Sequence, residues 1–202
     1  MDFVAIDFET ANELPTSAIE LGLAVVRNYK IVETRSWLIR PPDLRFNPYT
    51  TKIHGLSAKD IQDMPSFETL WPEISVYLNN QLVIAHNADF DLLVLRSLLI
   101  HYKLPMDNIQ YACSIKLAKR AFDGKASYGL KNLTKDLGIE LNHHRAESDA
   151  QACAIIASRA FQTFAVSFLH EVAAKTSIVP QLLNTLPKPP SKRALRKKRS
   201  SK

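Results

Sequence analysis

The sequence has little cysteine and no long hydrophobic run. Only two of its 202 residues are cysteines, Cys113 and Cys153, which are too few and too isolated for a disulfide framework or a zinc site. No stretch approaches the roughly 20 consecutive apolar residues that span a bilayer, so we expect no membrane association. The first residues lack the basic start and the apolar run of a signal peptide. Together these absences predict a protein of the reducing cytoplasm.

Acidic residues are missing from the end of the chain. Eight basic residues and no acidic one lie between Lys188 and Lys202. The remaining residues include 18 basic and 20 acidic side chains, so they carry −2 although the whole chain carries +6. We expect residues 1–176 to form one domain and residues 177–202 a flexible basic tail. Such a tail either attracts nucleic acid non-specifically or only keeps the protein in solution.

The pattern of apolar residues predicts strands first and then strands alternating with helices. We expect strands at residues 2–7, 18–27, 30–39, 82–85 and 109–113, with Asn28-Tyr29 as a hairpin turn. We expect helices at residues 66–78, 88–102, 115–122, 130–137 and 146–175. Residues 43–56 fit neither pattern and are expected to be irregular. This order of elements indicates an α/β domain with a mixed sheet.

Two acidic residues stand at the end of the first expected strand. Asp7 and Glu9 are two positions apart, so their side chains share one face of that strand. Two carboxylates so close repel each other, and one pKa should rise unless a cation lies between them. The alternative interpretation is an exposed acidic turn.

Two further acids interrupt the apolar faces of expected helices. Asp91 shares a face with Leu95 and Leu98, and Asp149 precedes a row of small apolar residues. A buried carboxylate needs a partner because burying it unpaired is costly. The alternative is an acid in the first helical turn, which the helix dipole favours by about 0.3–1 kcal/mol. The small residues would let the second helix lie close to the sheet, bringing Asp149 near the first strand.

Four carboxylates are hard oxygen ligands, which suit Mg²⁺ or Mn²⁺ rather than zinc. Two such ions about 3.5–4 Å apart are a standard device for in-line displacement at phosphorus. The sequence therefore favours a site with two divalent cations and phosphoryl-transfer chemistry.

The acidic residues lie in three segments, which are Asp7-Phe8-Glu9-Thr10, His86-Asn87-Ala88-Asp89-Phe90-Asp91 and His144-Arg145-Ala146-Glu147-Ser148-Asp149. In this order they resemble the exonuclease motifs of the DnaQ-like (DEDDh) family, which includes the epsilon subunit of bacterial DNA polymerase III. The similarity spans roughly residues 1–165. It implies an RNase H-like fold with a five-stranded mixed sheet flanked by helices.

The resemblance also implies roles for single residues. The metal ligands would be Asp7, Glu9, Asp91 and Asp149. His144, five residues before Asp149, would be the general base, for which a neutral imidazole is well suited.

Residues near the bound 3′ end follow from the same resemblance. Thr10 and His54 are candidate contacts to the terminal nucleotide, and Asn87 either touches substrate or caps its helix. Leu14 and Phe90 are candidates to wedge the last bases apart, although core packing is the better interpretation of Phe90.

The expected function is a metal-dependent 3′-to-5′ exonuclease that releases nucleoside 5′-monophosphates from single-stranded or mismatched DNA. The alternatives are an exoribonuclease like RNase T or oligoribonuclease, and a non-catalytic nucleic-acid-binding module on the same fold. All five catalytic positions are filled, which favours an enzyme. Residues 162–168 faintly resemble a sliding-clamp peptide, but their apolar spacing favours packing. Association with a polymerase or clamp is not decided by the sequence.

Overall fold

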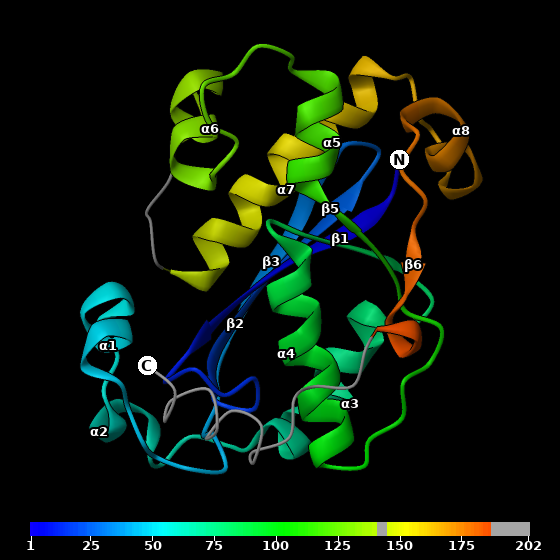
Figure 1. Cartoon of the computed structure of the whole chain (residues 1–202). Helices are drawn as coiled ribbons and strands as arrows, with labels where there is room; N and C mark the ends of the chain where they lie inside the picture. Colours follow the sequence, from blue (N-terminus) through cyan, green and yellow to red (C-terminus); the bar gives the residue numbers. More distant parts are fainter. Residues whose placement is uncertain (141–144, 187–202) are drawn as a thin grey trace, which may run out of the picture.

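A six-stranded mixed sheet forms the centre of the computed structural model, which describes residues 1–140 and 145–186 (Figure 1). The strand order is β3-β2-β1-β4-β5-β6. The strands are β1 (Phe3–Thr10), β2 (Ala18–Arg27), β3 (Lys30–Leu38), β4 (Leu82–Ala85), β5 (Gln110–Cys113) and β6 (Gln181–Leu182). β1, β4 and β5 run parallel, whereas β2, β3 and β6 pair antiparallel with their neighbours. The expected α/β class with a mixed sheet is confirmed.

Helices cover both faces of this sheet (Figure 1). α3 (Phe67–Leu78) and α4 (Ala88–His101) pack on one face, and α5 (Ser114–Ala121) and α7 (Ala146–Thr163) pack on the other. The remaining helices are α1 (Pro48–His54), α2 (Ala58–Ile61), α6 (Leu130–Leu137) and α8 (Val172–Thr176), with short 3₁₀ turns η1 (Leu169–Glu171) and η2 (Leu183–Thr185). Because β1, β4 and β5 are parallel neighbours, their C-terminal ends lie side by side at one end of the sheet. Ligands commonly bind at this end in open α/β sheets.

Alternate residues of each strand point to opposite sides of the sheet, and the helix residues that pack on the two sides differ mainly in size. On the α3–α4 side, Ile6 and Phe8 join a cluster that includes Phe67 and Trp71. We call this the large-residue face. On the α7 side, which we call the small-residue face, Phe3 and Ala5 of β1 meet Cys153, Ala154, Ala157, Ala160 and Phe161 of α7.

The expected hairpin turn is confirmed. Asn28 and Tyr29 join β2 to β3 with φ values of 48° and 64°. Positive φ at both central residues is typical of the type I′ turn, whose twist matches that of the flanking strands. The Tyr29 hydroxyl also donates a hydrogen bond of 2.7 Å to the carbonyl of Val166, which fixes this hairpin against the segment after α7.

Two expected segments differ in the structure. Residues 43–56 are not wholly irregular, because α1 begins at Pro48 with Asn47 as its N-cap, and the Asn47 side chain accepts the N–H of Tyr49. An N-cap followed by proline at the first helical position is a strong local start signal that apolar periodicity does not register. The expected helix over residues 146–175 ends at Thr163. Ala165 then has a φ of 50°, which turns the chain away before α8 begins.

The packed domain also extends beyond residue 176. β6 pairs with the outer edge of β5, and Leu183 after it is buried, so the sheet has six strands rather than five. An edge strand offers unpaired backbone groups that a two-residue segment can satisfy without any apolar pattern of its own. Residues 187–202 lie outside the described residues, and the flexible basic tail therefore stays a prediction.

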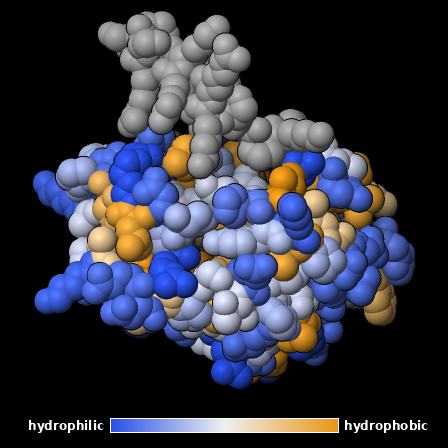
Figure 2. Space-filling view, turned by 90° about the horizontal axis from the view of Figure 1, so that it is seen from below, coloured by the Kyte–Doolittle hydropathy of each residue, from blue (hydrophilic) through white to orange (hydrophobic). Residues whose placement is uncertain are grey.

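Within residues 1–140 and 145–186, no helix is long and apolar enough to cross a bilayer. On the face shown in Figure 2, hydrophobic residues form small separate groups among polar ones. The exposed large hydrophobic side chains include Tyr49, Val76, Phe90 and Phe168. Single exposed apolar residues are ordinary for a protein surface, so only their positions relative to a site carry information.

Candidate active site

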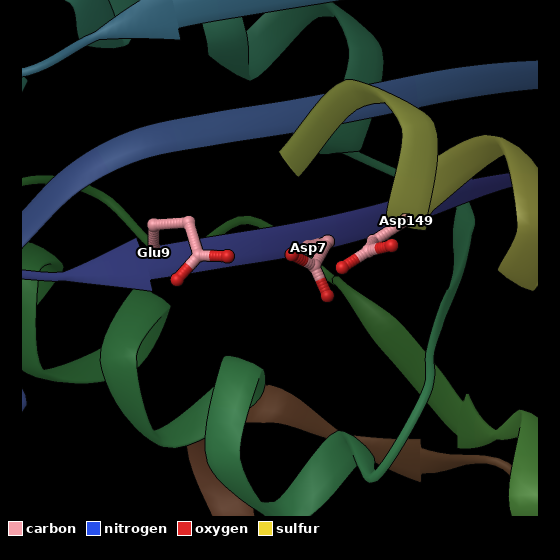
Figure 3. Close-up of side chains that lie close together, drawn as sticks. All are labelled: Asp7, Glu9 and Asp149. Atoms are coloured by element: carbon pink, nitrogen blue, oxygen red, sulfur yellow. The ribbon is translucent and has the colours of Figure 1, made fainter. Parts of the chain in front are cut away.

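Asp7, Glu9 and Asp149 lie together at the C-terminal end of β1. Each offers a carboxylate oxygen, and these oxygens lie within 4.8 Å of one another. Figure 3 shows Asp7 and Glu9 on β1 and Asp149 on the first turn of α7, with their carboxylates directed toward a common region. The expected nearness of Asp149 to the first strand is therefore confirmed.

The start of α7 sits directly on β2, and Gly22 makes this possible. A Cβ atom at Gly22 would overlap the backbone carbonyl of Ala146, which cannot rotate away as a side chain can. The hydroxyl of Thr34 on β3 donates a 2.6 Å hydrogen bond to Glu147 and holds the same turn. Because Gly22 is the partner of Asp7 across the β1–β2 ladder, this contact brings the α7 acid Asp149 to Asp7.

The three carboxylates are unfavourable as neighbours in the absence of positive charge. Burial, with repulsion from Asp91, Asp149 and Glu9 in that order, raises the pKa of Asp7 well above its ordinary value. Burial and repulsion from Asp149 raise the pKa of Glu9 to about 7. A divalent cation among these oxygens would remove the repulsion. The all-oxygen donor set fits Mg²⁺ or Mn²⁺.

Asp91 enters the site from the opposite face of the sheet. It lies in the first turn of α4, is 2% exposed, and its Oδ1 accepts the backbone N–H of Phe8 at 2.9 Å. Burial raises its pKa to about 8, although the hydrogen bond from Phe8 acts in the opposite direction. Repulsion from Asp91 is the largest Coulombic cause of the raised pKa of Asp7. Asp91 is not part of the trio within 4.8 Å, and its role as a metal ligand stays a prediction.

His144, the expected general base, lies outside the described residues. The next residue, Arg145, is described as the N-cap of α7. α7, which carries Asp149, begins directly after Arg145, and the role of His144 stays a prediction.

The expected substrate contacts lie in different surroundings. Thr10 lines a pocket of about 360 Å³ together with Leu14 and Phe90. Asn87 is exposed and adopts a left-handed conformation (φ 71°) before α4, where its side chain makes no capping hydrogen bond. His54 is buried at the end of α1, and its Nδ1 accepts the N–H of Leu56 at 3.1 Å. Whether any of them touches substrate stays a prediction.

Phe90 was expected in the core, and this expectation is wrong. Its side chain is 44% exposed and borders the pocket beside Thr10. The apolar stripe of α4 is formed by Leu92, Leu95 and Leu98 instead, which leaves position 90 on the outer side of the first turn. An aromatic ring that faces a pocket instead of the core is available to a ligand.

Two polar residues near the site have roles that the sequence patterns did not reveal. Glu20 on β2 is 1% exposed and stands directly opposite Glu9. The sequence did contain a sign of this position, because Glu20 is the one acidic residue in the otherwise apolar segment from Ala18 to Val26. His86 at the end of β4 uses both ring nitrogens within the fold, toward the hydroxyl of Ser114 (2.8 Å) and the carbonyl of Tyr128 (3.0 Å). Burial lowers the pKa of His86 to about 4, so it serves as a neutral structural link.

Comparison with known proteins shows the family to which the chain belongs. The family model described as exonuclease (RNase_T) matches residues 4–157. DNA polymerase III PolC-type of Caldanaerobacter subterraneus subsp. tengcongensis is 28% identical over 158 residues, covering 77% of this chain and 11% of that protein. The 3′-5′ exonuclease DinG of Staphylococcus haemolyticus is 30% identical over 165 residues, covering 80% of this chain and 18% of that protein. The chain thus spans less than a fifth of the length of these curated relatives.

Solved structures show the same fold. Exonuclease X, in complex with 5′ overhanging duplex DNA, superposes with a TM-score of 0.66 and 26% identity over 86% of this chain and 96% of that one. The zinc-bound ExoI–ssDNA complex of E. coli has a TM-score of 0.68 and 19% identity over 80% of this chain and 40% of that one. At that identity the second likeness concerns the fold alone.

Proposed function

The chain belongs to the RNase_T family of exonucleases, and from this premise we propose that it removes nucleotides one at a time from the 3′ ends of DNA with the help of divalent cations. The products are nucleoside 5′-monophosphates. The observation that carries the proposal is the trio Asp7, Glu9 and Asp149, which meets at the end of a central strand although its members are far apart in sequence. A buried cluster of like charges has no stabilising role by itself.

We assign the cation site to these three carboxylates, with Asp91 as the fourth acidic ligand. Mg²⁺ or Mn²⁺ bound there would supply the positive charge that lowers the barrier to in-line displacement at phosphorus. The protein contributes a fixed donor set: Asp7 and Glu9 are held by the β1 ladder, Asp91 by the Phe8 N–H, and Asp149 by the seating of α7 on Gly22. Fixed placement of this kind avoids reorganisation during the reaction.

The pocket beside Thr10 is the proposed site of the 3′-terminal nucleotide. It lies at the end of β1, and its lining includes the polar side chains Thr10 and Asn12 as well as the ring of Phe90. Exposed aromatic rings stack on nucleobases with little preference among them, which suits an enzyme that removes any terminal residue. His144, placed by its spacing from Asp149, is the proposed acceptor of the proton from the attacking water.

DNA is favoured over RNA as the substrate. The named relatives include a DNA polymerase and the solved Exonuclease X holds duplex DNA. The chain matches 96% of the Exonuclease X structure but only 11% of the polymerase, so the former carries most of this preference.

A labelled-strand assay tests this function. Single-stranded DNA, single-stranded RNA and a mismatched primer–template, each carrying a 5′ label, are incubated with Mg²⁺, with Mn²⁺ or with EDTA. The expected result is a ladder of progressively shortened DNA in either metal and intact strands in EDTA. Faster shortening of RNA than of DNA would overturn the choice of substrate, and full activity in EDTA would overturn the metal-dependent reaction.

His144→Ala and His143→Ala form a matched pair for the general base, since the two histidines are adjacent. We expect His144→Ala to lose at least about a hundredfold in rate, within the usual range for a general base, and His143→Ala to stay near wild type. Equal rates for both variants would remove His144 from the mechanism.

A further inference from the structure

We propose that Glu20 is a fifth acidic member of the cation site, a positioning residue that strengthens cation binding without being one of the ligands named above. The proposal rests on the metal-dependent function. Glu20 lies on β2 and is the cross-strand partner of Glu9 on β1. Directly opposed residues of antiparallel strands project from the same face, with Cβ atoms about 4.5–5.5 Å apart. Glu20 therefore shares the face that carries Asp7, Glu9 and Asp149.

The two carboxylate oxygens of Glu20 have different surroundings. Oε1 accepts a hydrogen bond of 3.0 Å from the hydroxyl of Ser36 on β3, and Nη2 of Arg145 lies 3.6 Å from it. Oε2 is completely buried, and no group in the described part of the chain donates a hydrogen bond to it. A buried acceptor without a donor is costly, and the cost is greater when the group is charged.

The ion pair with Arg145 does not account for this arrangement. Its distance of 3.6 Å is long, the Arg145 side chain is 57% exposed, and it approaches the oxygen that Ser36 already serves. Exposed pairs of this kind contribute little. Like charges directly opposite on neighbouring strands are moreover destabilising, so Glu20 weakens the cation-free protein.

With a divalent cation bound among Asp7, Glu9 and Asp149, the negative charge of Glu20 would become stabilising instead of destabilising. Glu20 then adds a negative charge and a buried acceptor oxygen beside the ion, from a side chain that is itself 1% exposed. Electrostatic attraction in such surroundings is stronger than in water. Residues that contact the metal ligands without binding the metal themselves commonly contribute tenfold or more to metal affinity.

The test measures Mn²⁺ affinity and metal-free stability of the full chain. Mn²⁺ is titrated calorimetrically into wild type and Glu20→Gln after EDTA treatment and dialysis, and Tm is recorded in EDTA. The expected result is at least about tenfold weaker Mn²⁺ binding by Glu20→Gln, with a Tm in EDTA equal to or above that of wild type. A merely structural Glu20 would instead show a lowered Tm in EDTA with unchanged affinity, and that result would overturn the proposal.

Glu33→Gln is the matched control. Glu33 is a carboxylate on the adjacent strand β3 that accepts hydrogen bonds from Arg35 and Tyr77, outside the cluster. Its variant should bind Mn²⁺ like wild type. The two proposals fail separately: if wild type binds Mn²⁺ but does not shorten DNA, the function is wrong, and if Glu20→Gln matches wild-type affinity while wild type shortens DNA, only the Glu20 assignment is wrong.

Discussion

The large-residue face and the small-residue face of the central sheet differ in what they allow a helix to do. On the large-residue face, Phe67 and Trp71 keep α3 at side-chain distance from the strands. On the small-residue face, alanines and Gly22 let the backbone of α7 touch that of β2. The packing of α3 buries apolar surface. The close contact of α7 with β2 fixes the position of the first turn of α7, which carries Asp149, relative to the sheet.

This difference explains why the acidic cluster is asymmetric. Asp7 and Glu9 share the small-residue face, and Asp149 reaches them because α7 lies close. Asp91, from α4 on the other side, approaches around the end of β1 and is tied to the backbone of Phe8. The close backbone contact at Gly22 thus sets where α7 presents Asp149, and the hydrogen bond from Phe8 helps to set the position of Asp91.

Asp7→Asn is expected to have the largest effect. It removes the charge at the centre of the cluster while keeping the side-chain size, and we expect activity to fall on the order of 10³-fold in the labelled-strand assay. Ile6→Val, the neighbouring residue on the large-residue face, should cost about 0.5–1.5 kcal/mol of stability and little activity. A comparable loss of activity in both variants would contradict the interpretation that Asp7 on the small-residue face serves catalysis and Ile6 on the large-residue face serves packing.

Gly22→Ala breaks the close contact itself. The added methyl group must displace the backbone of Ala146, and with it Asp149, so we expect about a hundredfold loss of activity together with a lower Tm. Leu21→Met, one residue away on the large-residue face, conserves volume and should cost less than about 1.5 kcal/mol. Activity assays at saturating Mg²⁺, paired with thermal melts, distinguish misplacement from unfolding. A fully active Gly22→Ala enzyme would show that the contact is dispensable.

Phe90→Ala tests the pocket on the substrate side. Loss of one stacking ring costs about 1–3 kcal/mol per base, which corresponds to roughly tenfold or more in KM, with a smaller change in kcat. Val76→Ala on α3 is the control, because Val76 is 72% exposed and is not among the pocket-lining residues. Steady-state kinetics on a short single-stranded DNA provide the measurement. If KM were the same for the two variants, the nucleotide would not bind against Phe90.

The acidic cluster should also give the metal-free protein an unusual pH dependence. The pKa of Glu9 is raised to about 7 and that of Asp91 to about 8, so between their ordinary values and these the folded state binds more protons than the unfolded state. Their contribution to stability is therefore complete in acid and is lost as pH rises through 7 and 8. The lowered pKa of His86, about 4, acts oppositely but only below pH about 6.5.

We therefore expect the Tm in EDTA to fall by a few degrees between pH 6.5 and 8.5, at about 2–4 °C per kcal/mol for a domain of this size. Mn²⁺ should flatten the curve, and so should Glu9→Gln in EDTA. A Tm that rises over this interval would mean that the cluster is not destabilising when charged.

Removal of residues 187–202 is expected to have the smallest effect. The deletion takes away eight basic residues and leaves a slightly acidic remainder, so DNA binding at low salt should weaken and its salt dependence should decrease. Hydrolysis per bound strand should not change, because the deletion removes none of the acidic residues of the cluster. Fluorescence anisotropy at several salt concentrations, with single-turnover rates alongside, separates the two quantities. An equal fall in the single-turnover rate would assign the tail a part in the chemistry.

Local sequence was sufficient for most elements and for the alternation within them. Period-two alternation puts Asp7 and Glu9 on one side of β1, and the positive-φ residues Asn28 and Tyr29 form the expected hairpin. Asp91 and Asp149 could be selected because an acid on an apolar helix face needs a partner. The position of His144 rested on motif spacing and is still untested.

Apart from the expected nearness of Asp149 to the first strand, the contacts between segments remote in sequence could not be predicted from the sequence. Apart from Phe90, the sequence by itself indicated which residues of the strands and helices face the core and that four acids need partners, because periodicity is a property of each segment alone. Only the tertiary structure decided that Asp149 meets Asp7 over Gly22, that Glu20 stands opposite Glu9, and that Phe90 borders a pocket. The physical reason is that these relations depend on how closely whole elements approach, and that approach is set by the size of side chains contributed by several elements at once.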